Sequence, residues 1–132
     1  MMDKKSLLIE EPILKKIFAE VFASCNSVYA TLVSTTDGHP LAQRSKVKLN
    51  ESTLAAMTSS SIALGDRIAA EVHQTGCDLT IIQNTEGYLA IKRVGQKWVL
   101  TVIADKKVNL GLLLTSTKNA AKLLDTEIKK QK

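Results

Sequence analysis

The sequence predicts an α/β (α+β) domain, a three-layer α/β/α sandwich around a five-stranded antiparallel sheet. The first observation is the order of its elements, α-ββ-α-βββ-α, which follows from helical and alternating apolar patterns. The second is that neighbouring strands are joined by short connections containing glycine, as in antiparallel hairpins. The third is that segments 28–36 and 98–104 are apolar on both alternating faces, so they belong mid-sheet with helices on both sides. The 132 residues are expected to form a single domain, 1–132, with its core at about 11–127 and a basic tail at 128–132.

The first helix and the first hairpin are predicted from local signals. The helix is expected to begin near Pro12, because proline is favoured at the first helical position. The β-branched segment 28–36 predicts a strand. Asp37-Gly38 then indicates a tight hairpin turn, because this dipeptide readily adopts positive φ at both positions. The returning strand, 41–47, alternates apolar and polar residues and is expected at a partly exposed edge.

The second helix is unusual because it has no charge between Glu51 and Asp66, whereas an ordinary surface helix has a charged back. It is expected to run from a cap at Asn50 to a stop at Gly76. The face expected to meet the sheet is the most apolar one, with Leu54, Met57, Ser61, Leu64, Ile68 and Val72. The expected back is small and neutral, with Ala56, Ser59, Ser60, Ala63 and Ala70. Small side chains allow close approach, so a second copy of the chain, and then another partner, are expected to cover this helix.

The remainder of the chain follows a conventional pattern. Three short strands are expected at 77–84, 87–94 and 98–104. Asn109 is expected to cap a final helix that has one apolar stripe and an opposite polar face.

Composition argues against nucleic-acid and membrane partners. The net charge is +5, but the basic residues are scattered in pairs along the chain. Of five aromatic residues only Tyr88 and Trp98 lie near basic strand residues, so a base-stacking surface is not expected. No stretch approaches the ~20 apolar residues of a membrane span, and a cytoplasmic protein is expected. Cys25 and Cys77 are far apart in the sequence and are expected to be free and reduced.

No catalytic residue, cofactor site or metal site is predicted. His39 and His73 lack partners at metal-ligand spacing, and the serines at 59–61 lie outside a nucleophile-elbow motif. The phosphate-loop pattern GxxxxGK[ST] is absent, so the chain is not expected to be a GTPase itself.

Two stretches resemble the Roadblock superfamily, whose fold is profilin-like. STTDGHPLA is similar to the first hairpin of that family, and ADKKVNLGLLL is similar to its C-terminal segment. The structural residues within them are Asp37 and Gly38 of the turn, Asn109 as helix cap, and Gly111, expected to let the preceding strand approach closely. The family includes dynein-associated light chains, lysosomal scaffold subunits and MglB-type partners of bacterial Ras-like GTPases. The single-domain length is most similar to the prokaryotic branch.

The resemblance implies a homodimer in which the second helix and the third strand meet their counterparts, the third strands pairing into one continuous sheet. Arg67 is a charge within the small-residue back, where it is placed to meet an acidic group of a partner or to remain solvated. A role as an arginine finger is not expected, because Arg67 lies inside a long helix. The residues assigned to the dimer or partner interface are Ala55, Ala56, Ser59, Ser60, Ile62, Ala63, Arg67, Ala70, Asp78, Thr80 and Ile82.

The leading functional hypothesis is a non-catalytic homodimeric module that binds a Ras-like small GTPase and regulates its nucleotide cycle. A structural scaffold subunit without effect on GTP hydrolysis is the first alternative. A small-ligand sensor is the second, and it would need an interior pocket, which the bulky filling of the sheet disfavours.

Overall fold

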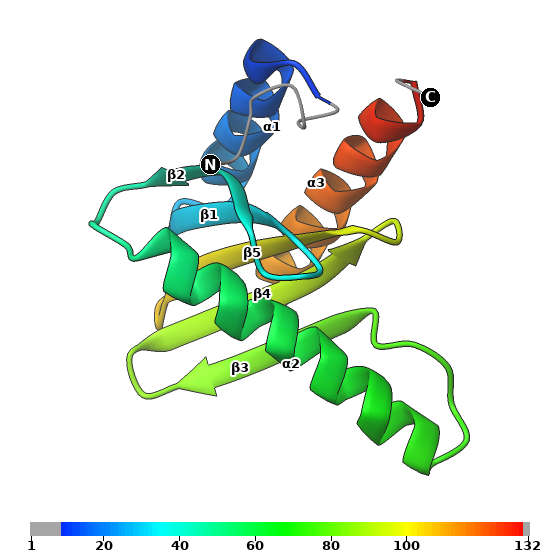
Figure 1. The fold of residues 1–132 in the computed structure, drawn as a ribbon. Coiled ribbons are helices and arrows are strands. Elements are labelled where there is room, and N and C mark those ends of the chain that lie inside the picture. The colour runs from blue at the N-terminus through cyan, green and yellow to red at the C-terminus, as the bar shows by residue number, and fades with distance from the viewer. Residues whose placement is uncertain (1–8, 131–132) are drawn as a thin grey trace.

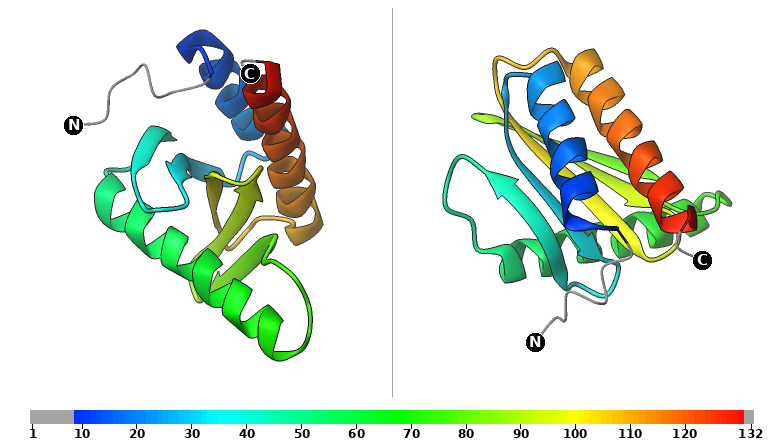
Figure 2. Two further views of the ribbon diagram at one scale, coloured as in Figure 1. Left: turned by 45° about the vertical axis from the view of Figure 1, so that its right-hand side comes forward. Right: turned by 90° about the horizontal axis from the view of Figure 1, so that it is seen from above.

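The computed structural model describes residues 9–130, which form three layers (Figure 1). The elements are α1 (Glu11–Ser24), β1 (Val28–Thr35), β2 (Pro40–Ser45), α2 (Glu51–Glu71), β3 (Leu79–Asn84), β4 (Gly87–Val94), β5 (Trp98–Asp105) and α3 (Leu110–Lys130). α2 crosses one face of the sheet, and α1 and α3 lie side by side on the other (Figures 1 and 2). The predicted α/β/α sandwich and element order are confirmed.

The sheet is antiparallel throughout, with strand order β2-β1-β5-β4-β3. The two strands that are apolar on both faces, β1 and β5, lie inside the sheet as predicted, and nearly all their residues are buried. β2 and β3 are the edges, and both are partly exposed. The arrangement leaves one side of β3 without a strand partner within residues 9–130.

The main core lies between the sheet and the α1/α3 layer. It joins helical residues such as Leu14, Phe18, Leu113 and Leu124 to Leu100 of β5. A smaller cluster, formed by Ile62, Ile91 and Val99, lies on the other face beneath α2. α2 is therefore held by far less apolar contact than the opposite helical layer.

The β1–β2 turn and the end of α2 differ from the expectation. The β1–β2 connection is wider than the predicted two-residue turn: Thr35 N–H donates to the His39 carbonyl at 2.8 Å, and of the predicted pair only Gly38 has positive φ. α2 ends at Glu71 rather than near Gly76, because the Gln74 N–H closes the helix end on the Ala69 carbonyl.

The C-terminal residues also differ from the expectation of a tail. α3 continues to Lys130, so residues 128–130 are helical, and residues 131–132 lie outside the described part of the chain.

Both predicted helix caps are confirmed. Asn50 Oδ1 accepts from the Thr53 N–H at 3.0 Å, and Asn109 Oδ1 accepts from the Leu112 N–H at 2.9 Å. Gly111 does not serve a close strand approach: a Cβ added there would meet only Asn109 Oδ1, at 3.2 Å. The glycine therefore leaves room for the capping oxygen.

Asp66 ties the second half of α2 to the sheet. Its Oδ1 accepts a hydrogen bond from the Cys77 N–H. Arg93 Nη2 donates to both carboxylate oxygens, at 2.7 Å to Oδ2 and 2.9 Å to Oδ1. Arg93 Nε donates in turn to the Cys77 carbonyl at 2.9 Å. The Cys77 N–H, and then the Arg93 guanidinium, hold the pKa of Asp66 below its ordinary value. Asp66 thus fixes where the end of α2 lies above β4 and the start of β3.

Gly87→Ala is expected to destabilise the fold by about 1–3 kcal/mol, because overpacked sites in a rigid interior relax poorly. The added Cβ would lie 2.2 Å from the Ala104 carbonyl oxygen, a backbone atom of the paired strand. Urea unfolding measures the change, with Glu86→Ala, at the exposed neighbouring position in the β3–β4 turn, as the control. Equal unfolding midpoints for the two variants would contradict the account.

The lowered pKa of Asp66 predicts a loss of stability in acid. Because the fold favours the ionised carboxylate, its contribution is fully present above the ordinary value of 3.8 and is lost as pH falls through the lower folded-state pKa. Asp66→Asn should be less stable than the unmodified protein at neutral pH, with the gap narrowing below about pH 4. The urea unfolding midpoints of both proteins are measured from neutral to acid pH. A difference between the two midpoints that stays constant with pH would refute the prediction.

Candidate protein-interaction surface on α2 and β3

α2 turns its small residues, rather than its most apolar face, toward the sheet. Ala55, Thr58 and Ile62 are buried, at 0%, 2% and 2% exposure. The close approach extends to Gly65, where an added Cβ would lie 2.4 Å from Cys77 Sγ. The prediction that the Leu54–Val72 stripe faces the sheet is wrong: Ala55, Thr58 and Ile62 are buried on that side, whereas Met57, Leu64, Ile68 and Val72 are exposed. Ala55 and Ile62 are therefore core residues, and their assignment to an interface is wrong.

The large apolar residues of α2 face outward instead. We call this surface the α2 seam, defined by Met57, Leu64, Ile68 and Val72, which are 57–64% exposed. Their spacing of seven, four and four residues places them along one side of the helix. Burial of one such side chain stabilises by roughly 1.5–3 kcal/mol, so four left in water indicate a surface that another molecule covers.

The α2 seam lies on the same side of α2 as the free edge of β3. A Cβ added at Gly65, which lies one turn before Ile68 on α2, would be 2.4 Å from Cys77 Sγ and 4.0 Å from Thr80 Oγ1 of β3. The second half of α2 extends across β3 and past it (Figure 1). Ile82 of β3 is also exposed, at 38%. Helix and strand together therefore present one apolar, uncharged surface beside an unpaired strand edge.

The flank of α2 toward the β1–β2 turn carries the small residues of the predicted back. We call it the outer stripe, defined by Ala56, Ser60, Ala63, Arg67 and Ala70, all exposed. It borders the β1–β2 turn, where a Cβ added at Gly38 would lie 3.4 Å from the Ala56 Cα. Ser59, also predicted, is half-buried against this turn, 3.2 Å from the same added Cβ.

The turn itself is ordered by Asp37. Its carboxylate accepts from the Thr35 hydroxyl and contacts His39 Nδ1 at 3.2 Å, and these two contacts lower its pKa. Asp37 and Gly38 are thus structural, as expected, and they border the outer stripe.

The other predicted residues divide between the two surfaces. Thr80 and Ile82 lie on β3, half-buried and exposed, respectively. Asp78 precedes β3 and forms an ion pair with Lys92 at 2.7 Å. The four seam residues were not among the predicted interface residues, although their regular spacing was visible. The sequence did not indicate which of the uncharged sides of α2 packs against the sheet, and the exposure of the seam residues depends on that choice.

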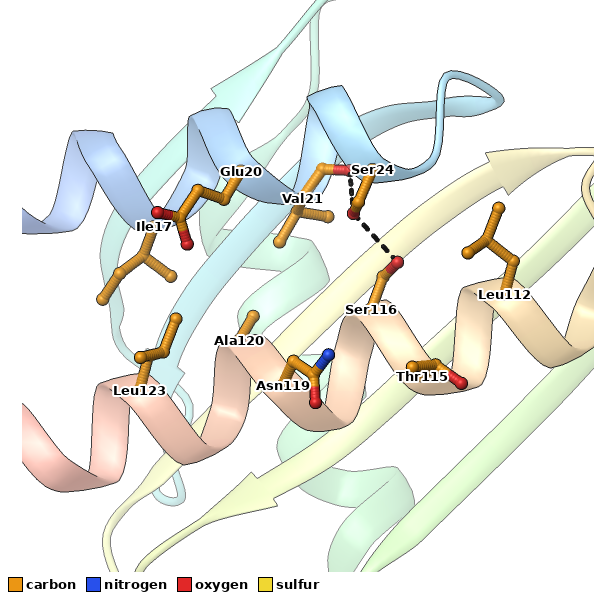
Figure 3. A pocket seen from close by; sticks show the side chains of 10 residues that line it. All are labelled: Ile17, Glu20, Val21, Ser24, Leu112, Thr115, Ser116, Asn119, Ala120 and Leu123. Carbon is orange, nitrogen blue, oxygen red and sulfur yellow. Dashed lines mark hydrogen bonds between the residues drawn. The ribbon is translucent and has the colours of Figure 1, made fainter.

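A shallow groove of about 260 Å³ lies between α1 and α3 on the other side of the molecule (Figure 3). Ile17 and Val21 of α1 face Ala120 of α3, and a 3.0 Å hydrogen bond joins the Ser24 and Ser116 hydroxyls. The groove opens to the surface between two helices and does not enter the sheet. It does not provide the interior pocket that a small-ligand sensor requires.

Catalytic machinery is not apparent in the described residues. Within residues 9–130, no three His, Cys, Asp or Glu side chains are grouped to hold a metal ion. Cys25 and Cys77 are both free, and burial raises the pKa of the Cys25 thiol. No helix between residues 9 and 130 has the length and apolarity to span a membrane.

Comparison with known sequences finds distant archaeal relatives. No family model matches the chain. An uncharacterized protein of Methanocaldococcus jannaschii, MJ0714, is 28% identical over 96 residues, covering 73% of this chain and 80% of that protein. A second uncharacterized protein from the same organism, MJ0310, is 29% identical over 94 residues, covering 71% of this chain and 82% of that protein.

Comparison with solved structures identifies the fold. The gliding protein MglB of Thermus thermophilus superposes with a TM-score of 0.83 over 90% of each chain, at 16% identity. An MglB described as having a tetrameric arrangement superposes with a TM-score of 0.85, covering 93% of this chain and 94% of that chain, at 18% identity. A Roadblock/LC7 domain from Streptomyces avermitilis superposes with a TM-score of 0.79, covering 86% of this chain and 96% of that chain, at 12% identity. The resemblance first noted in two short stretches thus extends in fold over 86–93% of the chain, which has the Roadblock fold.

Proposed function

We propose that the chain is a homodimeric interaction module that binds a Ras-like small GTPase and regulates its nucleotide cycle. The observation that carries the proposal is the α2 seam beside the unpaired edge of β3. In the proposed dimer, β3 pairs with β3 of a second copy, and the two α2 seams cover each other and Ile82. The similarity in fold to MglB supports the GTPase as the class of partner.

The two sheet edges differ in a way that favours β3 as the dimer edge. β3, Leu79–Asn84, contains no charged residue. The opposite edge carries Arg44 on β2 and Lys46 just after it, and both cations lie over the Phe22 ring, at 4.6 and 5.5 Å from its centroid. Cations along an edge oppose pairing with another strand. Strand pairing between copies is therefore favoured at β3.

The outer stripe is the proposed contact for the GTPase. Its three alanines, Ala56, Ala63 and Ala70, lie on the flank of α2 toward the β1–β2 turn, whereas the α2 seam lies on the flank toward β3, so a partner could reach them with the seam covered. Its alanines and serines allow a partner's backbone to come close, and Arg67 has no ion pair with any residue from 9 to 130. A carboxylate of the GTPase would satisfy this guanidinium at the edge of the contact.

A scaffold subunit without effect on hydrolysis is the alternative. It uses the same dimer and the same outer stripe but leaves the rate of GTP hydrolysis unchanged. The two functions are separated by turnover measurements with a Ras-like GTPase of the same organism in three mixtures: the GTPase, this chain, and both together.

Leu64→Glu should dissociate the dimer without unfolding the subunit. Leu64 is 57% exposed in the subunit, whereas in the dimer the introduced carboxylate would be buried without a partner, which costs roughly 3–5 kcal/mol. That cost weakens association by roughly two to four orders of magnitude. Light scattering after size exclusion should report twice 14.4 kDa for the unmodified protein and a monomer for the variant.

Leu110→Glu is the matched control, since Leu110 is also exposed, at 40%, but lies at the start of α3. It should remain dimeric, and circular dichroism should be native for both variants. A monomeric unmodified protein, or a Leu64→Glu variant that stays dimeric, would refute the assembly.

Ala63→Arg should abolish the effect on the GTPase while preserving the dimer. Ala63 is exposed on the outer stripe, so a free surface would tolerate the change within about ±0.5 kcal/mol. A packed partner would have to bury the added cation or lose contact. Ala19→Arg, at an exposed position of α1, is the control. If Ala63→Arg stays dimeric and still binds and stimulates the GTPase, the outer stripe is not the contact.

A further inference from the structure

A basic groove runs along the far side of α3. It consists of two adjoining hollows, of about 330 and 310 Å³, that share Val94, Gly95 and Asp125 as lining residues. It lies between α3 and the β4–β5 hairpin, on the face of the sheet opposite α2. It is therefore separate from both the α2 seam and the outer stripe, and the inference below does not rest on the proposed function.

The groove concentrates positive charge that is otherwise scattered along the sequence. Six cationic side chains line it, against the two carboxylates of Asp78 and Asp125: Lys92, Arg93, Lys97, Lys118, Lys122 and Lys129. In the sequence these six residues are scattered, and they come together because the fold places the β4–β5 turn beside α3.

Half of these cations are already neutralised. Lys92 pairs with Asp78 at 2.7 Å, and Lys129 pairs with Asp125 at 3.0 Å. Arg93 is held by Asp66, as described above. The carboxylates near the groove are thus matched by these three cations and leave no negative charge for the others.

Three ammonium groups remain without a partner. Lys97, Lys118 and Lys122 form no ion pair with a residue of the described chain. Lys118 and Lys122 are one helical turn apart on α3, where like charges repel. An anionic ligand in the groove would relieve this repulsion and would meet all three groups from one side.

The floor of the groove is apolar. Val94, Trp98 and Ala121 are 2%, 5% and 4% exposed, and Ile128 is half-buried beside them. Because these three side chains are buried, the exposed ammonium groups around them present most of the surface that a ligand can reach.

The same features disfavour nucleic acid and a lipid surface. Base stacking needs an accessible aromatic face, and Trp98 is buried. Membrane attachment needs protruding apolar side chains, and the large exposed apolar residues found within 9–130 lie elsewhere. We propose that the basic groove binds an acidic segment of a partner protein, its carboxylates facing Lys97, Lys118 and Lys122 and its other side chains beside the half-buried Ile128.

Fluorescence anisotropy with a short labelled peptide of glutamate and leucine tests this proposal, with the glutamine-for-glutamate peptide as the neutral probe. The acidic peptide should bind more tightly than the neutral one, and its affinity should fall as salt is added. The double variant Lys118→Glu/Lys122→Glu should weaken binding by at least about tenfold, because two attractions become repulsions. Lys97→Glu, in the turn, should weaken binding in the same direction while leaving α3 unchanged.

The matched control is Lys106→Glu/Lys107→Glu, which makes the same change in net charge at exposed positions between β5 and α3. It should bind the acidic peptide nearly as the unmodified protein does. Equal binding of the acidic and neutral peptides, or equal losses in the two double variants, would overturn the proposal. So would tighter binding of single-stranded DNA or phosphatidylserine vesicles through Lys118 and Lys122. The dimer mass and the stimulation of the GTPase are measured in separate experiments. A failure of acidic-peptide binding would therefore overturn the groove proposal without bearing on the proposed function.

Discussion

The close approach of α2 to the sheet is the constraint on which the rest of the structure depends. Between this helix and the strands there is room for Ala55, Thr58 and Ile62, and at Gly65 the helix comes close enough to Cys77 that even a methyl group would clash. Ile62 is the large side chain of α2 that is buried on this side, together with Ala55 and Thr58. Met57, Leu64 and Ile68 lie on a different side of the helix and stay exposed, which leaves the α2 seam open.

This constraint gives one helix three surfaces with different physical roles. Its inner side holds the subunit together through a small cluster around Ile62, and Asp66 fixes its second half through Arg93 and Cys77. Its seam is apolar and ends beside an uncharged strand edge. Its outer stripe is small and nearly neutral. A subunit with these three sides is suited to joining a copy of itself and a different partner at the same time, as a regulator or a scaffold requires.

Most of the fold follows from the sequence, whereas much of the candidate interface does not. Strand order and layers were predictable because β1 and β5 are apolar on both faces, and the caps at Asn50 and Asn109 marked helix starts. The orientation of α2 was not predictable from its helical wheel, because two of its faces carry no charge. Apolarity favoured placing Leu64 against the sheet, but in the structure Ile62 is buried there and Leu64 is exposed. The basic groove was also not predictable, since Lys97 and Lys118 line adjoining hollows only because the fold places the β4–β5 turn beside α3.

Amide hydrogen exchange of β3, followed as a function of protein concentration, tests the central claim most directly. If β3 pairs with its counterpart beneath two covered seams, its amides should become strongly protected above the association midpoint, while those of the β2 edge remain unchanged. Protection of β3 that is independent of concentration and no greater than that of β2 would contradict the account.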